Sequence, residues 1–177
     1  MHGKIYRTDF LRKNKIEFPP MRANEDVAFN KKVFLFEGVK VFYSKNIIHI
    51  FKDEKNSITR EKNTDTLKKI FSINSIESIY DIVTFFEKHG QLSNVLAVEV
   101  FKDLYLAYQT GLFYDLITEE IKNKIRYIFS NDKIKRLAKN KHFLKMICRD
   151  IPQCSTVVEE PILFEQSYKQ WLEEFRK

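Results

Sequence analysis

Cysteine, glycine and proline are scarce in this chain, and it has no long hydrophobic run. Its two cysteines, Cys148 and Cys154, favour free thiols over a disulfide-stapled fold. Four glycines and four prolines are too few for a linker or a low-complexity protein. Charged residues interrupt each apolar run before the ~20 residues that a membrane-spanning helix needs. Since residues 1–4 also lack the apolar core of a signal peptide, we expect a cytoplasmic protein.

Large apolar side chains, in contrast, are abundant. The 177 residues are 44% hydrophobic and include 16 Phe and 8 Tyr. A compact chain of this length buries roughly 70% of the surface that its unfolded form exposes, so these side chains can build a core. The length predicts one or two small domains.

Charge is divided into zones along the chain, whose net charge is +7. Residues 1–60 carry +6 (13 basic and 7 acidic side chains), and residues 61–121 carry −5 (5 and 10). Residues 122–145 carry +8 (9 and 1), and residues 146–177 carry −2 (4 and 6). Two basic zones therefore flank an acidic zone, which is more informative than the total.

Residues 1–60 have a mixed pattern, for which we predict an α/β fold. A short helix is expected within Ile5–Lys13. Asn24 is a good helix N-cap, and the helix that it opens would end at Gly38. The β-branched and aromatic residues that follow predict strands at 39–43 and 47–51.

Beyond a boundary near residue 62 the apolar residues have helical spacing. Asn74 with Glu77 three residues later resembles a capping box, and Gly90 would end the helix that follows. Ser93 and Thr118 are further expected helix starts. The sequence thus predicts an α/β region of residues 1–61 and an all-α region of residues 62–177, with a chain that is mainly helical overall.

The sharpest local motif is Asn24-Glu25-Asp26. This pattern is typical of an N-cap followed by two acids that stabilise the first turn of a helix. A carboxylate at a helix start beside a pocket can also accept a proton from a hydroxyl nucleophile. Spacing alone leaves both interpretations open.

Three landmarks follow one another within the first sixty residues. They are Gly3-Lys4-Ile5-Tyr6-Arg7-Thr8-Asp9-Phe10-Leu11, then Ile16-Glu17-Phe18-Pro19 leading into Asn24-Glu25-Asp26-Val27-Ala28-Phe29, and last Asn56-Ser57-Ile58-Thr59-Arg60 after an aromatic segment. The ordered set resembles the second half of the catalytic domain in bacterial family 2 glycosyltransferases, which have the GT-A fold. The resemblance covers about a third of the chain.

The resemblance implies roles for individual residues. The aspartate of the acidic pair is the base that deprotonates the acceptor hydroxyl, a role that falls on Asp26, while Glu25 would orient the acceptor or the helix start. Residues implied to contact the acceptor or the phosphates are Lys4, Tyr6, Arg7, Lys52 and Arg60. The implied substrates are a nucleotide-sugar and a glycan or lipid-linked acceptor, in bacterial surface polysaccharide synthesis.

The nucleotide-binding half that precedes this region in the family has no counterpart here. The sequence lacks the Asp-x-Asp motif, the usual site of the divalent cation (Mg²⁺ or Mn²⁺) that the resemblance implies, and it lacks a glycine-rich phosphate loop. We therefore expect an acceptor-side fragment of such an enzyme, which a separate N-terminal half would complement.

A basic stretch runs from Lys122 to Lys145, with apolar residues at helical spacing among its lysines. Such a stretch is typical of contact with an anionic membrane surface, here the inner face of the cell membrane. The residues assigned to this contact are Lys133, Lys135, Arg136 and Lys139. A solvated lysine-rich surface is the alternative. Nucleic acid is not expected, because the aromatic residues of this stretch sit on its apolar stripe and offer no platform on which bases could stack.

A second function class therefore stays open, a non-enzymatic helical module that binds an anionic membrane or a partner protein through its basic face. The histidines and cysteines lack the spacing of metal ligands, so no metal site is predicted. Near the C-terminus, Trp171 and Phe175 are expected to dock the last helix on the core.

Overall fold

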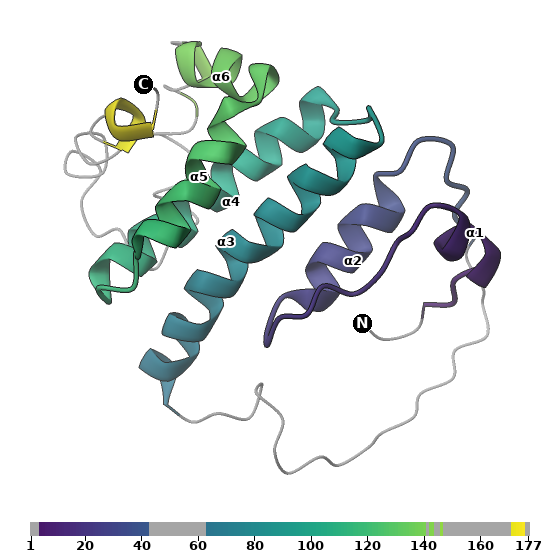
Figure 1. Cartoon of the computed structure of the whole chain (residues 1–177), viewed down its shortest axis with the longest axis horizontal. Helices are drawn as coiled ribbons and strands as arrows, with labels where there is room; N and C mark the ends of the chain where they lie inside the picture. The colour runs from purple at the N-terminus through teal and green to yellow at the C-terminus, as the bar shows by residue number, and fades with distance from the viewer. Residues whose placement is uncertain (1–3, 43–62, 141, 144–145, 147–170, 176–177) are drawn as a thin grey trace.

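The computed structural model describes residues 4–42, 63–140, 142–143, 146 and 171–175, and within these ranges it contains helices and no strand (Figure 1). The predicted α/β fold of residues 1–60 is therefore wrong for the part of it that the structure describes. Residues 39–42, at the start of the first predicted strand, are not in a strand. No described segment pairs with them, and an extended segment without a ladder partner forms no stable sheet. The strand predicted at 47–51 lies outside the described residues.

The described ranges contain six helices. They are α1 (Thr8–Lys13), α2 (Glu25–Phe34), α3 (Thr64–Lys88), α4 (Asn94–Phe113), α5 (Glu119–Ser130) and α6 (Asp132–Lys139). Residues 171–175 are helical as well. None of the described helices is long and apolar enough to cross a bilayer.

Hydroxyl and amide side chains mark where these helices begin. Ser93 Oγ accepts the backbone N–H of Leu96, and Thr118 Oγ1 accepts that of Ile121, so both predicted helix starts are confirmed. The predicted capping box is wrong, because α3 begins upstream of it at Asn63, whose side chain accepts the N–H groups of Asp65 and Thr66.

Asn74 instead lies inside α3 and makes a tertiary contact. Its Oδ1 accepts the backbone N–H groups of Arg22 (3.1 Å) and Ala23 (3.3 Å), which lie just before α2. The side chain satisfies two backbone donors, one of them on the buried Ala23, in a segment that is far away in sequence. Asn74 therefore helps to position the start of α2.

Helix α3 is the centre of the arrangement. It contacts α4 most extensively and also packs against α2 on one side and α5 on the other, while α6 contacts α4 and α5 (Figure 1). The helical spacing predicts one apolar face of α3 from Ile76, Ile79, Tyr80, Val83 and Phe86. Four of these residues are buried, and Tyr80 is half-buried. Residues of α2 join the same hydrophobic core, among them Ala28, Phe29 and Val33.

The C-terminal segment completes this core. Trp171 is 2% exposed and packs edge-on against the rings of Phe101, Tyr105 and Phe129, with centroid separations of 5.6, 4.9 and 5.1 Å. Phe175 is also buried. The docking role predicted for Trp171 and Phe175 is confirmed.

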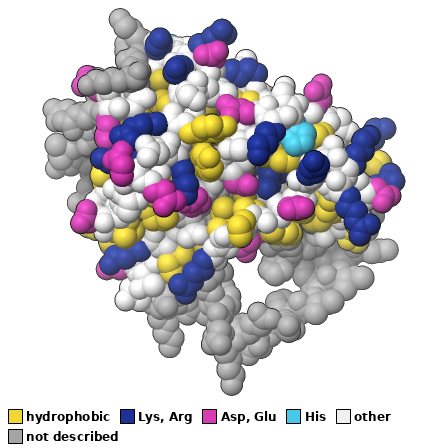
Figure 2. All heavy atoms as spheres, in the orientation of Figure 1, with side chains coloured by type: hydrophobic (Ala, Val, Ile, Leu, Met, Phe, Trp, Pro, Cys, Tyr) yellow, Lys and Arg dark blue, Asp and Glu magenta, His cyan; other side chains and the backbone are white. Residues whose placement is uncertain are grey.

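Ion pairs between helices neutralise the charge zones of the sequence. The pairs join basic residues of α2 and α5 to acids of other helices, namely Lys31 to Asp103 and Glu99, Lys32 to Asp81, Lys122 to Glu174, and Lys124 to Glu77. Lys124 also pairs with Glu120 of its own helix. Basic and acidic side chains are accordingly interspersed over much of the face in Figure 2. The acidic zone lies between the basic zones in space as well as in sequence, because it contains α3 and α4.

Candidate functional site

The acidic pair of the sharpest motif lies in the first turn of α2. Glu25 and Asp26 are the first two residues of this helix, and both are half-buried. The unpaired N–H groups and the dipole at a helix N-terminus stabilise negative charge there. Asp26 therefore lies at a helix start, as both interpretations of the motif require, although it is not in the wall of either cavity described below.

Asn24 does not cap this helix in the predicted way. Its backbone is left-handed, with φ 63°, and its side chain makes no capping bond. Asn24 Nδ2 instead donates to Ser75 Oγ of α3 at 2.8 Å. Asn tolerates the left-handed conformation better than most residues. The prediction of an N-cap bond at Asn24 is wrong because its left-handed backbone departs from the extended conformation of a capping residue, and its amide group is directed at Ser75 instead.

Tyr6 approaches the start of α2 from the segment before α1. Its hydroxyl donates to Asn30 Oδ1 at 2.6 Å, and Asn30 Nδ2 donates to the backbone oxygen of Asp26 at 2.7 Å. The ring of Tyr6 packs edge-on against Phe29, which also stacks on Phe18. Two segments of the resemblance, those of Tyr6 and Asp26, thus meet in space.

The pKa of Tyr6 reflects its approach to Asp26. Burial raises the pKa of the Tyr6 hydroxyl above its usual value, and the negative charge of Asp26 raises it further. The phenol is therefore neutral near pH 7 and remains a hydrogen-bond donor. Asn30 was not predicted as a site residue; its position one helical turn after Asp26 was the available signal.

The other residues implied to bind substrate divide into two groups. Lys4 and Arg7 flank Tyr6 and are exposed, and the backbone oxygen of Arg7 accepts the Leu11 N–H at the start of α1. Lys52 and Arg60 lie outside the described residues. The structure thus brings Tyr6 to Asp26 and leaves the side chains of Lys4 and Arg7 directed at solvent.

The residues assigned to membrane contact lie on α6. Lys133, Lys135, Arg136 and Lys139 are all exposed, although Lys133 Nζ also donates to the backbone oxygen of Leu92. The apolar residues Ile134 and Ala138 of this helix are buried in the core, so α6 offers charge but no free apolar face. At the upper end of Figure 2, where α6 lies, basic side chains predominate.

Carboxylates are too dispersed in the described residues to fit the divalent cation that the resemblance implies. No cluster of three or more His, Cys, Asp or Glu side chains occurs among them. A protein site for Mg²⁺ or Mn²⁺ needs several oxygen ligands that converge on one point. No step of the chemistry below is therefore assigned to a metal ion.

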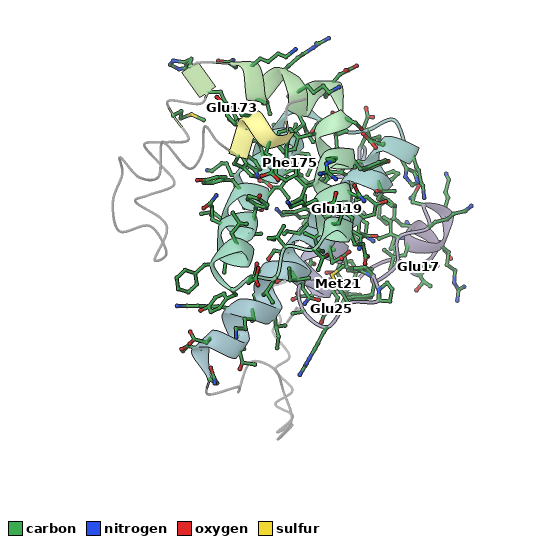
Figure 3. All side chains as sticks on the ribbon, turned by 60° about the vertical axis from the view of Figure 1, so that its left-hand side comes forward. Glu17, Met21, Glu25, Glu119, Glu173 and Phe175 are labelled. Atoms are coloured by element: carbon green, nitrogen blue, oxygen red, sulfur yellow. The ribbon has the colours of Figure 1, made fainter. Side chains whose placement is uncertain are left out.

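Two cavities adjoin α3. One, of about 550 Å³, lies between residues 19–22 and the middle of α3, with Tyr80 and Asp81 in its wall. The other, of about 370 Å³, lies among α2, α3 and α4 and has Lys68 and Phe71 in its wall. Figure 3 labels Met21, which lines the larger cavity, close to Glu25 of α2.

Sequence patterns did not reveal the larger cavity, because its wall combines a loop with residues of α3 that are distant in sequence.

Comparison with protein-family models, with curated proteins and with solved structures found no match to this chain.

Proposed function

We propose that this chain supplies the acceptor side of a glycosyltransferase active site, with Asp26 as the catalytic base. The observation that carries the proposal is the meeting of Tyr6 and Asp26 through Asn30. Two motifs that resemble the family separately in sequence lie together in the described structure. A half-buried aspartate at a helix N-terminus is a setting in which a carboxylate can take a proton from a hydroxyl.

The reaction that follows is an inverting transfer. The Asp26 carboxylate takes the proton of the acceptor hydroxyl, and the hydroxyl oxygen forms a bond to the anomeric carbon of the donor sugar. The bond from that carbon to the nucleoside diphosphate breaks, and its electron pair leaves with the phosphate oxygen. Tyr6 and Asn30 hold the start of α2 in place and act as positioning residues, because Tyr6 donates to Asn30 and Asn30 donates to the backbone oxygen of Asp26.

The donor must be bound largely by groups outside this chain. Since the sequence lacks both an Asp-x-Asp motif and a glycine-rich phosphate loop, a separate nucleotide-binding half is part of the proposal. The exposed Lys4 and Arg7 beside Tyr6 are the cations of the described residues that are best placed to face the donor phosphates.

An extract of source cells from which the gene has been deleted tests the proposal, because it supplies any separate half. Purified chain is added, and transfer of radiolabelled sugar from UDP-sugars into glycan is measured. We expect wild-type chain to restore transfer, and Asp26→Asn to restore it at least about 100-fold less well. The control Asp9→Asn, which changes an exposed acid of α1 in the same way, restores it fully.

Two outcomes contradict the assignment. One is that wild-type chain restores no transfer, and the other is that Asp26→Asn restores it as well as wild type does. Calorimetric titration of the isolated chain with UDP and Mn²⁺ is expected to give no binding. Clear binding there would show that the chain carries a donor site of its own.

The basic surface of α6 favours a second candidate function, binding to an anionic membrane. Within the described residues Lys135, Arg136 and Lys139 have no acidic partner, whereas Lys122 and Lys124 of α5 are ion-paired. Each basic residue near an anionic bilayer contributes about 1 kcal/mol, so three give reversible adsorption. The buried apolar face of α6 means that the contact is electrostatic and does not insert into the bilayer.

Vesicle sedimentation separates this function from the first. We expect the chain to sediment with vesicles that contain phosphatidylserine and to be released from them by high salt. It should not sediment with vesicles of pure phosphatidylcholine. Replacing Lys135, Arg136 and Lys139 by Gln should abolish sedimentation. The same replacements at Arg12, Lys13 and Lys40, which are exposed on another part of the chain, should not. Equal losses of sedimentation in both triple variants would show that the net charge alone, and not the surface of α6, causes the binding.

A further inference from the structure

The larger cavity has a wall that combines carboxylates with flat apolar side chains. Glu77 and Asp81 lie one helical turn apart on α3, and Tyr80 lies between them. Pro19 and Pro20 line the cavity from the loop side. A volume of about 550 Å³ is in the range of small-molecule sites.

Each of the two carboxylates is ion-paired with a lysine of a neighbouring helix. Glu77 Oε1 lies 2.6 Å from Lys124 Nζ of α5, and Asp81 Oδ2 lies 2.8 Å from Lys32 Nζ of α2. Each lysine engages one oxygen of its partner, so the second oxygen can accept a further hydrogen bond. The wall therefore presents acceptors without excess negative charge, which suits hydroxyl donors better than a metal ion or a polyamine.

The apolar part of the wall is held rigidly. The Tyr80 ring packs edge-on against Tyr127 at a centroid distance of 5.2 Å, and Lys124 Nζ lies 6.0 Å from the Tyr80 centroid. Such a fixed aromatic plane, together with two proline rings, suits the C–H face of a sugar ring.

Arg22 adds a donor at the edge of the cavity. Its backbone N–H is held by Asn74 Oδ1, while its side chain is exposed and makes no hydrogen bond or ion pair with the rest of the described chain. A guanidinium donates to ring and hydroxyl oxygens of a polyol. Four residues after Arg22 along the chain lies Asp26, in the first turn of α2.

We propose that this cavity binds a neutral saccharide unit of the acceptor. Glu77 and Asp81 accept hydrogen bonds from its hydroxyls, Tyr80 packs on its apolar face, and Arg22 donates to its oxygens. That the bound saccharide is the acceptor rests on the proposed glycosyltransferase function. That the cavity binds a saccharide does not depend on it.

An NMR titration of the full chain with methyl glycosides of glucose, galactose and N-acetylglucosamine tests the proposal. We expect at least one glycoside to bind with a dissociation constant in the millimolar range. Its amide shifts should concentrate at residues 19–22 and 74–84. Arg22→Ala and Tyr80→Leu should each weaken binding at least fivefold.

The smaller cavity supplies matched controls, because Lys68→Ala and Phe71→Leu make the same kinds of change in its wall. They should leave glycoside affinity unchanged. The proposal is overturned if no glycoside binds, if the shifts map to the smaller cavity, or if the controls weaken binding as much as Arg22→Ala does. Tighter binding of spermidine at the same residues would also overturn it, in favour of a polycation site.

Asp26→Asn distinguishes this inference from the proposed function. The variant should retain glycoside binding while it fails to restore transfer. Binding without transfer by wild type would refute the glycosyltransferase function and leave the saccharide site standing. If transfer is observed and Arg22→Ala leaves its KM for the acceptor unchanged, the saccharide site is refuted and the glycosyltransferase function stands.

Discussion

Lys32 and Asp81 form an ion pair that joins α2 to α3, with Nζ 2.8 Å from Oδ2. Lys32 is 3% exposed, and its Nζ also donates to the backbone oxygen of Glu17 at 2.8 Å. The helix that carries Asp26 is thus fixed to the central helix by a buried charge. The same lysine reaches the loop that leads into this helix, so one side chain positions several parts of the candidate site.

Breaking this pair should destabilise the fold. Asp81→Asn leaves the Lys32 ammonium buried without its counter-charge, which costs several kcal/mol when both partners are buried. Because the Asp81 side chain is 33% exposed, we expect about 2 kcal/mol here. Asp103→Asn, at the exposed partner of Lys31, should cost less than about 1 kcal/mol. Urea unfolding of the two variants measures the difference, and equal losses would contradict burial of the Lys32 charge.

The approach of Tyr6 to Asp26 should be visible in the titration of the tyrosine. Burial and the Asp26 charge both raise the pKa of Tyr6, so Asp26→Asn should lower that pKa towards its usual value without restoring it fully. Glu25→Gln removes the neighbouring carboxylate and should leave the pKa of Tyr6 in place. NMR titration of ring-labelled tyrosine measures the pKa of Tyr6 in both variants. A change in this pKa that is larger in Glu25→Gln than in Asp26→Asn would contradict the approach of Tyr6 to Asp26.

Removal of Trp171 should be among the most damaging core substitutions. Its ring contacts Phe101, Tyr105 and Phe129 at the point where the C-terminal segment meets α4 and α5. Trp171→Ala is expected to lose about 3–5 kcal/mol of stability, as large-to-small core changes do. Phe113→Ala removes a ring that is 77% exposed and should cost about 0.5 kcal/mol or less. Thermal or urea unfolding followed by circular dichroism provides the comparison.

Alkaline pH should destabilise the protein through Tyr108. Burial raises the pKa of its hydroxyl above the usual 10.0, and the hydrogen bond to Glu174 and the charge of Glu174 raise it further. The folded state therefore holds this proton more tightly than the unfolded state does. The resulting stability is present below about pH 10 and is lost as pH rises above it.

Tyr108→Phe isolates this contribution. The variant lacks the hydrogen bond to Glu174 and should be less stable near neutral pH. Its urea midpoint should nevertheless fall less than that of wild type between about pH 8 and about pH 11, because the ionising group is gone. Parallel falls in the two proteins would contradict a raised pKa at Tyr108.

Local sequence patterns located most of the helices after residue 62. Ser93 and Thr118 act as caps where their positions predicted, and many apolar positions of α3 and α5, such as Ile76 and Ile125, are buried. These features depend on neighbours within one helical turn, so the sequence by itself determines them. The placement of Glu25 and Asp26 in the first turn of α2 was determined in the same local way.

Only the tertiary structure decided what the asparagines do. Asn24 and Asn74 both looked like N-caps, yet Asn24 bonds to Ser75 and Asn74 holds the backbone before α2. A side chain that can satisfy a nearby helix end can equally satisfy a distant polar group, and local spacing does not contain that competition. For the same reason the absence of a strand at 39–42 could not be predicted, since strand formation depends on a partner that is remote in sequence.

The charge zones show the same division. Composition along the chain determined that two basic zones flank an acidic one. Packing decided which charges are neutralised, because α3 and α4 bring their acids within reach of Lys31, Lys32 and Lys124 and not of the exposed basic residues of α6. Salt bridges require contact within a few ångströms, so the sequence sets the charges and the fold alone selects the pairs.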